Sequence, residues 1–175
     1  MANKDALREL QTRLAERLQS VRSGPAIESW LAVDCAGQGF LFPLRLAGEI
    51  FDSQRIVPVP HTQPWVVGVA NLRGGLHLVA DLGAFLGLRA AHRGALVEHE
   101  RLVGFNPNLA LNCALLVDRL EGLRRAGELQ REAGGDDDER PGFAGPRWKD
   151  DAGRVWQEID LAELAAHPRF LGVAG

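Results

Sequence analysis

Two histidines and one aspartate are the residues whose types and spacing suggest acid–base chemistry. His61 follows Pro60 in an apolar approach segment, and His77 and Asp81 stand four residues apart where a predicted strand leads into a helix. An imidazole held by a carboxylate can act as a general base, but a hydrolase also needs a nucleophile within reach of that base. No serine with an arranged base is near them. A small β-barrel enzyme or ligand-binding protein that uses His61, His77 and Asp81 is therefore the weaker of two hypotheses, and no catalytic residue is predicted.

The potential metal ligands do not have the spacing of a metal site. No two of the five histidines are spaced like zinc ligands on one helix face, and Cys35 and Cys113 are far apart in the sequence. Four consecutive acids, residues 136–139, lack the alternation and the closing glutamate of a calcium loop. No glycine-rich phosphate loop follows a strand. We therefore expect neither a metal nor a cofactor. The histidines are His61, His77, His92, His99 and His167.

The two cysteines lie inside apolar, strand-like runs, so we expect two buried thiols. A disulfide between them is the alternative. It would imply an oxidising compartment, which nothing else in the sequence supports.

One segment combines strand, turn and helix-cap signals. The apolar run Trp65 to Ala70 is followed by residues 71–74, Asn-Leu-Arg-Gly, which predict a type I turn with Asn71 first and Gly74 fourth. A second apolar run, Leu76 to Ala80, ends at Asp81. The carboxylate of Asp81 can accept from the first N–H groups of a short helix, 82–86, which Gly87 would close. The segment therefore reads as a hairpin that leads into a capped helix.

This segment resembles the CheW-like family, the adaptor proteins of bacterial chemotaxis-type signalling. The resemblance covers a proline-containing approach, a Gly-Val-x-Asn-Leu-Arg-Gly turn and an apolar strand that ends in Asp-Leu. One departure is Leu78, where many family members have proline. The matching residues are Pro58, Pro60, Gly68, Val69, Asn71, Leu72, Arg73, Gly74, Val79, Asp81 and Leu82.

The resemblance implies a mainly β fold of two SH3-like, five-stranded β-barrel subdomains around a shared apolar core. It also implies a non-enzymatic adaptor. Such a protein binds the regulatory domain of a chemotaxis-type histidine kinase and the cytoplasmic tip of a membrane chemoreceptor. The N-terminal helix and Leu78 are similar to the variant of the family that serves type IV pilus twitching motility.

The rest of the sequence agrees with a β-rich body. Short apolar runs alternate with turns about every ten residues, which is typical of a barrel or sandwich. Ala47 to Phe51 is too short and mixed to assign. The predicted strands are Ser29–Cys35, Phe40–Leu46, Gln54–Val59, Trp65–Ala70, Leu76–Ala80, Leu96–Glu98, Arg101–Phe105, Leu109–Arg119 and Val155–Ile159.

Two further segments complete the predicted organisation. Residues 1–23 form an amphipathic helix with a narrow stripe of Leu7, Leu10, Leu14, Leu18 and Val21, which either docks on the body or recruits a partner helix. Residues 24–175 form the CheW-like domain, with a solvated acidic loop over 131–146. Asp160 precedes a second short apolar helix, as Asp81 does, so short helices are expected after each barrel.

Composition limits the partners. The net charge is −3, with lysine and arginine scattered among acids, so nucleic acid is not an expected partner. No run approaches the ~20 apolar residues of a membrane span, so we expect no direct membrane insertion. Cytoplasmic location, with recruitment to membrane-associated receptor arrays, is the expectation.

The expected partner-binding residues lie in and beside the hairpin. Asn71 and Gly74 serve the turn, whereas turn chemistry does not require arginine at position 73, so its guanidinium is free for another role. Arg73 is an exposed charge, a bridge between the two barrels, or a receptor contact. The predicted set is Asn71, Arg73, Val57, Val59 and Val69.

Overall fold

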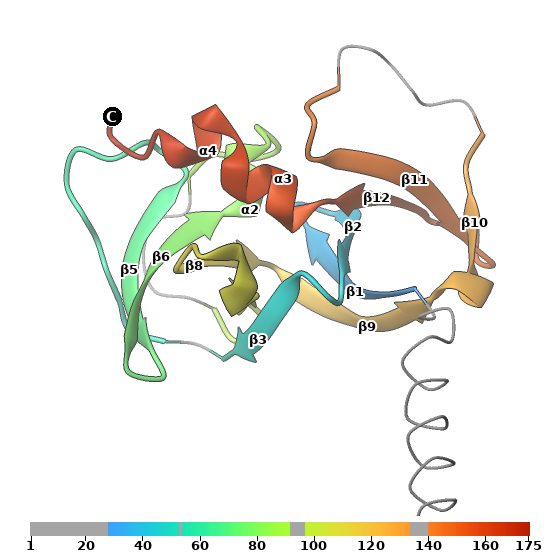
Figure 1. The fold of residues 1–175 in the computed structure, drawn as a ribbon, viewed down its shortest axis with the longest axis horizontal. Coiled ribbons are helices and arrows are strands. Elements are labelled where there is room, and N and C mark those ends of the chain that lie inside the picture. The colour runs from blue at the N-terminus through green and yellow to red at the C-terminus, as the bar shows by residue number, and fades with distance from the viewer. Residues whose placement is uncertain (1–27, 53, 92–96, 134–139) are drawn as a thin grey trace, which may run out of the picture.

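The computed structural model describes residues 28–52, 54–91, 97–133 and 140–175. Its body is mainly β, with three short helices gathered over the centre (Figure 1). The strands are β1 (Ser29–Cys35), β2 (Gln38–Pro43), β3 (Ala47–Phe51), β4 (Ile56–Val57), β5 (Val66–Leu72), β6 (Gly75–Asp81), β7 (Arg101–Phe105), β8 (Cys113–Val117), β9 (Arg119–Arg125), β10 (Leu129–Arg131), β11 (Ala144–Asp150) and β12 (Val155–Ile159). The helices are α2 (Leu82–Phe85), α3 (Leu161–Ala166) and α4 (Pro168–Leu171).

The strands form two six-stranded sheets. Sheet 1 has the order β10-β11-β12-β2-β1-β9, and sheet 2 has the order β3-β7-β8-β6-β5-β4. In each sheet the two edge strands are neighbours in the chain, so each sheet curls until its edges approach. The predicted count of five strands per barrel is wrong by one in each. The physical reason is that one strand is interrupted, by the 3₁₀ turn 126–128 in sheet 1 and between Phe51 and Ile56 in sheet 2.

The chain builds the sheets in an interleaved order. It places β1 and β2 in sheet 1, then all of sheet 2, and then returns with β9 to β12. Asp118 alone separates β8 from β9. The prediction of one strand over Leu109–Arg119 is therefore wrong, because the run crosses from one sheet to the other and begins in a 3₁₀ turn, Pro107–Leu109.

Three apolar clusters hold the fold together. The largest joins both sheets to α2, α3 and α4 and includes Phe42, Phe85, Leu115, Leu161 and Phe170, all less than 2% exposed. A smaller cluster lies on the inner face of each curled sheet. The predicted shared apolar core is thus present between the two sheets, and α2 and α3 follow β6 and β12 as expected.

Other strand boundaries differ for local reasons. β1, β7 and β12 match their predictions, whereas β2 ends at Pro43, because residues 44–46 form a turn in which Leu46 N–H donates to the Pro43 carbonyl. Only Ile56 and Val57 of 54–59 pair as a strand, since Pro58 has no N–H to donate. Residues 97–98 lie outside any strand, and the unassigned 47–51 segment is β3.

The predicted N-terminal helix, residues 1–23, lies outside the described residues, as does Leu96. The predicted acidic loop connects β10 to β11, although Arg131 ends β10 and residues 144–146 already belong to β11. Its acidic run, 136–139, is also outside the described residues.

Candidate functional site

The hairpin between β5 and β6 turns in two residues. Leu72 pairs with Gly75, so Arg73 and Gly74 are the central residues, with φ of +47° and +82°. Positive φ at both positions is the mirror-image turn that matches the twist of hairpin strands. The predicted type I turn over 71–74 is therefore wrong by one residue in register. Asn71 still serves the turn, because its side-chain oxygen accepts from Gly74 N–H at 2.9 Å.

Arg73 extends from the hairpin tip into solvent. Its side chain is 77% exposed and makes an ion pair with Glu49, which is 41% exposed. Glu49 is in β3 of the same sheet. The ion pair therefore links the β5–β6 hairpin to β3 within sheet 2, and it does not bridge the two sheets.

An apolar row runs outward from the hairpin to the edge of sheet 2. Val57 in the edge strand β4 is directly opposite Val69, which is opposite Leu78 in β6. Val57 is 51% exposed, and Val59 lies just beyond β4. Sequence reasoning missed Leu76, the most exposed large apolar residue among those described, at 65%. The signal that could have identified it is that Leu76 and His77 are consecutive in a strand, so their side chains point to opposite faces of the sheet.

The three residues of the enzyme hypothesis do not come together. His77 and Asp81 both lie in β6, and four strand residues span about 13 Å. The His77 Nδ1 atom lies 3.0 Å from the Gly75 carbonyl oxygen, while the exposed His61 sits in a separate loop. Asp81 is fully buried and caps α2, accepting from Ala84 N–H at 3.1 Å. No grouping of three or more histidine, cysteine or acidic residues suited to a metal occurs within the described ranges.

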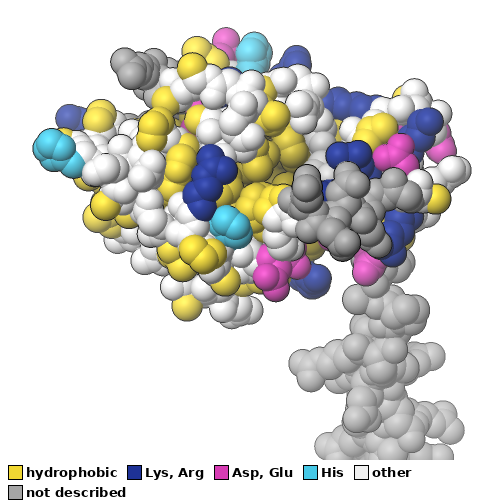
Figure 2. All heavy atoms as spheres, turned by 90° about the horizontal axis from the view of Figure 1, so that it is seen from above, with side chains coloured by type: hydrophobic (Ala, Val, Ile, Leu, Met, Phe, Trp, Pro, Cys, Tyr) yellow, Lys and Arg dark blue, Asp and Glu magenta, His cyan; other side chains and the backbone are white. Residues whose placement is uncertain are grey.

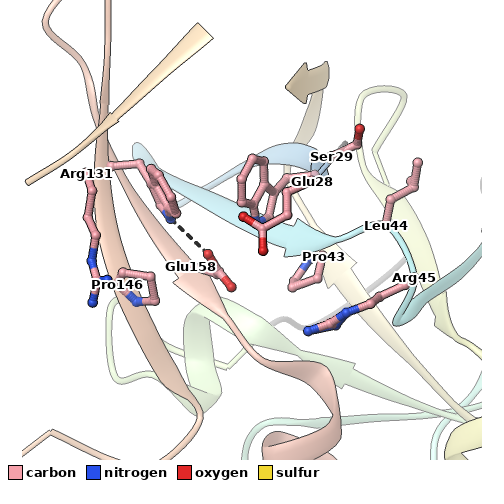
Figure 3. Close-up of a pocket in the computed structure, with 10 residues that line it drawn as sticks. Glu28, Ser29, Pro43, Leu44, Arg45, Arg131, Pro146 and Glu158 are labelled. Carbon is pink, nitrogen blue, oxygen red and sulfur yellow. Dashed lines mark hydrogen bonds between the residues drawn. The ribbon is translucent and has the colours of Figure 1, made fainter. Parts of the chain in front are cut away.

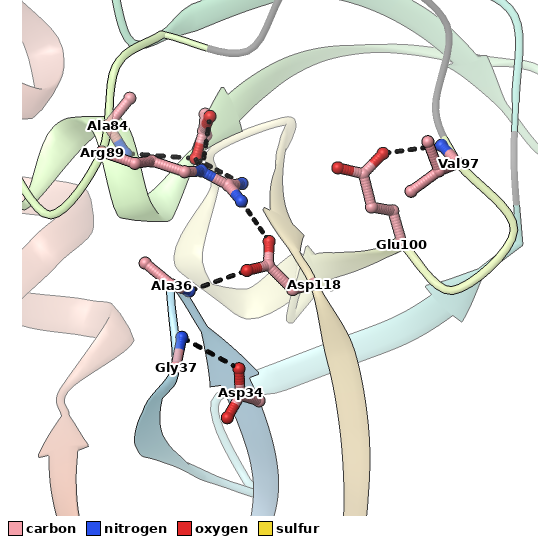
Figure 4. Close-up of polar contacts among 9 residues, drawn as sticks. Asp34, Ala36, Gly37, Ala84, Arg89, Val97, Glu100 and Asp118 are labelled. Carbon is pink, nitrogen blue, oxygen red and sulfur yellow. Dashed lines mark hydrogen bonds and ion pairs between the residues drawn. The ribbon is translucent and has the colours of Figure 1, made fainter.

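A polar junction ties the two sheets together, and sequence reasoning missed it (Figure 4). Arg89 contacts Asp81 at 2.9 Å and also Asp118, the residue between β8 and β9. Asp118 in turn accepts from Ala36 N–H, in the β1–β2 turn, at 2.7 Å. Burial opposes the charge of Arg89, but its hydrogen bonds and the charge of Asp81 outweigh burial and raise its pKa. The partners are far apart in the sequence, so no local pattern marks them.

The face that carries α2, α3 and α4 is a second candidate surface. Hydrophobic side chains gather there around a few charged groups (Figure 2). A hollow of about 380 Å³ is lined by Trp65, Ala84 and Arg169 among others. Arg169 is held in place, because its guanidinium lies 4.8 Å from the Phe85 ring centroid and donates to the Phe85 carbonyl at 2.8 Å. Leu171, at the end of α4, is 51% exposed.

The arrangement of two curled sheets around one core can be compared with known proteins. A CheW-like domain matches residues 29–169, which include every described strand. The chain belongs to the CheW-like family. This family consists of scaffolding proteins and not of enzymes, so the enzyme hypothesis is wrong.

Two relatives describe how far the similarity extends. Protein PilI of Pseudomonas aeruginosa is 33% identical over 106 residues, which are 57% of this chain and 54% of PilI. The chain thus spans about half the length of this curated relative. The crystal structure of scaffolding protein TtCheW from Thermoanaerobacter tengcongensis superposes with a TM-score of 0.62 at 18% identity, covering 77% of this chain and 89% of TtCheW. That likeness shows the fold alone.

Among the residues that the structure describes, none of the helices combines the length and the apolar character needed to cross a bilayer.

Proposed function

We propose that this CheW-like protein is an adaptor that couples a membrane chemoreceptor to a chemotaxis-type histidine kinase. The observation that carries the proposal is the family match over both sheets, residues 29–169. The similarity to PilI supports a narrower assignment, to the chemosensory system of type IV pilus twitching motility. The adaptor would act in the cytoplasm, recruited to receptor arrays and not inserted in the membrane.

The edge of sheet 2 is the proposed kinase surface. β4 is an edge strand that pairs only with β5. The curl of sheet 2 brings the β3 edge toward it, but no described strand pairs with its other side, which could therefore receive a partner strand. Val57, Val69 and Leu76 add an apolar surface beside that edge. Arg73 and Asn71 supply polar groups at the hairpin tip, and exposed apolar residues with a polar rim are typical of protein interfaces.

The helical face is the proposed receptor surface. A hollow lined by Trp65 and Ala84, with Leu171 exposed in α4, suits the apolar stripe of a partner helix. The two surfaces draw on different elements, β4 to β6 and α2 with α4. One protein could therefore hold kinase and receptor at the same time, as an adaptor must.

Isothermal titration with the kinase regulatory domain and with a receptor-tip fragment tests the proposal. We expect both to bind, and to bind together. Val57→Asp should weaken kinase binding at least about tenfold, since a buried interface anchor is worth ~1–2 kcal/mol or more. Val155→Asp is the matched control, because Val155 is 44% exposed but lies in sheet 1. Failure of the wild-type protein to bind either fragment would refute the adaptor function.

A further inference from the structure

A cavity opens at one end of the inner face of sheet 1, away from both proposed adaptor surfaces. Its volume is about 730 Å³, within the usual range of ligand pockets. Glu28 and Glu158 face the middle of the cavity, while Arg45 and Arg131 reach it from opposite sides (Figure 3). Trp30 and Trp148 line it, with their ring centroids 5.0 Å apart.

Glu158 is a half-buried carboxylate held by indole groups. It accepts a hydrogen bond from Trp148 Nε1 at 2.8 Å. Burial raises the pKa of Glu158, hydrogen bonds from Trp148 and Trp30 oppose that rise, and the negative charge of Glu28 adds to it. Within the described part of the chain, no lysine, arginine or histidine is within ion-pair distance of Glu28 or Glu158. The two carboxylates thus have no paired cation among the described residues, although Arg45 and Arg131 line the same cavity.

The same sheet contains a second tryptophan that donates to a carboxylate, and there a guanidinium lies over the indole ring. Trp156 is directly opposite Trp148 across β11 and β12, and its Nε1 donates to Asp150 at 2.9 Å, as Trp148 donates to Glu158. There the guanidinium of Arg154 lies over the Trp156 ring, 4.3 Å from its centroid. Neither Trp30 nor Trp148 carries such a guanidinium from any described residue.

We propose that this cavity binds an arginine side chain of a partner protein. A guanidinium between Glu28 and Glu158 would neutralise two carboxylates that now repel each other. It would also lie against an indole, as the guanidinium of Arg154 does at Trp156, where it pairs with Asp34. Arginine fits better than lysine, because its planar fork pairs with a carboxylate through two hydrogen bonds and stacks on aromatic rings. The proposal does not depend on the adaptor function, since the cavity lies outside the surfaces assigned to kinase and receptor.

Nuclear magnetic resonance of the full chain tests the proposal with N-acetyl-arginine amide as the probe. The four tryptophans give four indole N–H signals, which single Trp→Phe variants can assign. We expect saturable shifts for Trp30 and Trp148 with a dissociation constant on the order of 1–10 mM, as befits one side chain. Trp65, outside the cavity, should not shift. N-acetyl-citrulline amide, the neutral analogue, should produce no saturable shift.

One variant and a matched control sharpen the test. Glu158→Gln should weaken binding at least about tenfold, the usual loss for a charged hydrogen bond. Glu132→Gln removes the same charge from an exposed position in sheet 1's β10–β11 connection and should leave the affinity unchanged.

Three outcomes would overturn the proposal. One is equal binding of the citrulline analogue, which needs no variant and so holds even if Glu158→Gln does not fold. Another is unchanged affinity in folded Glu158→Gln. The third is much tighter binding of free arginine than of the blocked probe, which would make the ligand a free amino acid held also by Arg45 and Arg131.

Discussion

At the scale of single residues, Arg73 occupies a backbone conformation that glycine would adopt more readily. Its φ of +47° is left-handed, which costs a non-glycine residue roughly 1–2 kcal/mol. Its exposed ion pair with Glu49 is worth at most about 1 kcal/mol. An arginine kept at a cost to stability is a candidate for function.

The prediction for Arg73 separates its charge from its backbone. Arg73→Glu should preserve the fold, measured by circular dichroism, and weaken partner association by ~1–3 kcal/mol. Arg73→Gly should raise the melting temperature, because it removes the strained conformation, and yet weaken association similarly. If both variants bind kinase and receptor as the wild type does, Arg73 is ordinary surface and the binding role belongs to the row from Val57 to Leu76.

The two capping aspartates are predicted to differ in strength. Asp160 only caps α3, accepting from Ala162 and Glu163 N–H at 2.8 and 3.0 Å, so Asp160→Ala should lower the free energy of unfolding by about 0.5–2 kcal/mol. Asp81 caps α2 and also pairs with Arg89 while fully buried. Asp81→Ala should therefore cost more, about 2–4 kcal/mol. Urea unfolding measures both, and equal losses would contradict the added role of the Arg89 pair.

At the scale of elements, the sequence predicted what depends on local pattern. Asp81 and Asp160 are caps because their carboxylates accept hydrogen bonds from the first N–H groups of the helix that follows. Such a cap can be predicted from adjacent residues in the sequence. The Arg89–Asp118 contact could not be predicted, because it joins segments that only the tertiary fold brings together. β3 was missed because only Ala47 is buried in it, and β11 because none of its residues is buried and it contains no apolar run.

The N-terminal segment gives a prediction at this scale. If residues 1–23 form the predicted helix, its apolar stripe of Leu7, Leu10, Leu14, Leu18 and Val21 must be covered by the chain's own body or by a partner. If the body covers it, deletion of residues 1–22 should lower the melting temperature and promote aggregation, measured by light scattering. A truncated protein that keeps its stability but loses a partner would instead assign the stripe to recruitment.

At the scale of the whole molecule, the shared apolar cluster is larger than the cluster inside either sheet. It takes residues from both sheets and from all three described helices, and Arg89 and Asp118 join the sheets beside it. Neither sheet could keep its apolar face covered after the other had unfolded. The two curled sheets should therefore unfold together, although they are separate sheets.

The two cysteines, one in each sheet, can test whether the two sheets unfold together. Cys35 is in β1 of sheet 1 and Cys113 in β8 of sheet 2, and both are free and fully buried. Burial raises the pKa of each thiol to about 12, so at pH 8 both stay protonated and unreactive until the fold opens. Pulsed alkylation across a urea series, read by mass spectrometry of the two cysteine peptides, should give one shared midpoint.

Phe85→Ala, which removes about 3–5 kcal/mol from the shared cluster, should lower both midpoints equally. Reaction of one cysteine at clearly lower urea than the other would show that the sheets unfold separately, and that the shared core couples them less than its size implies.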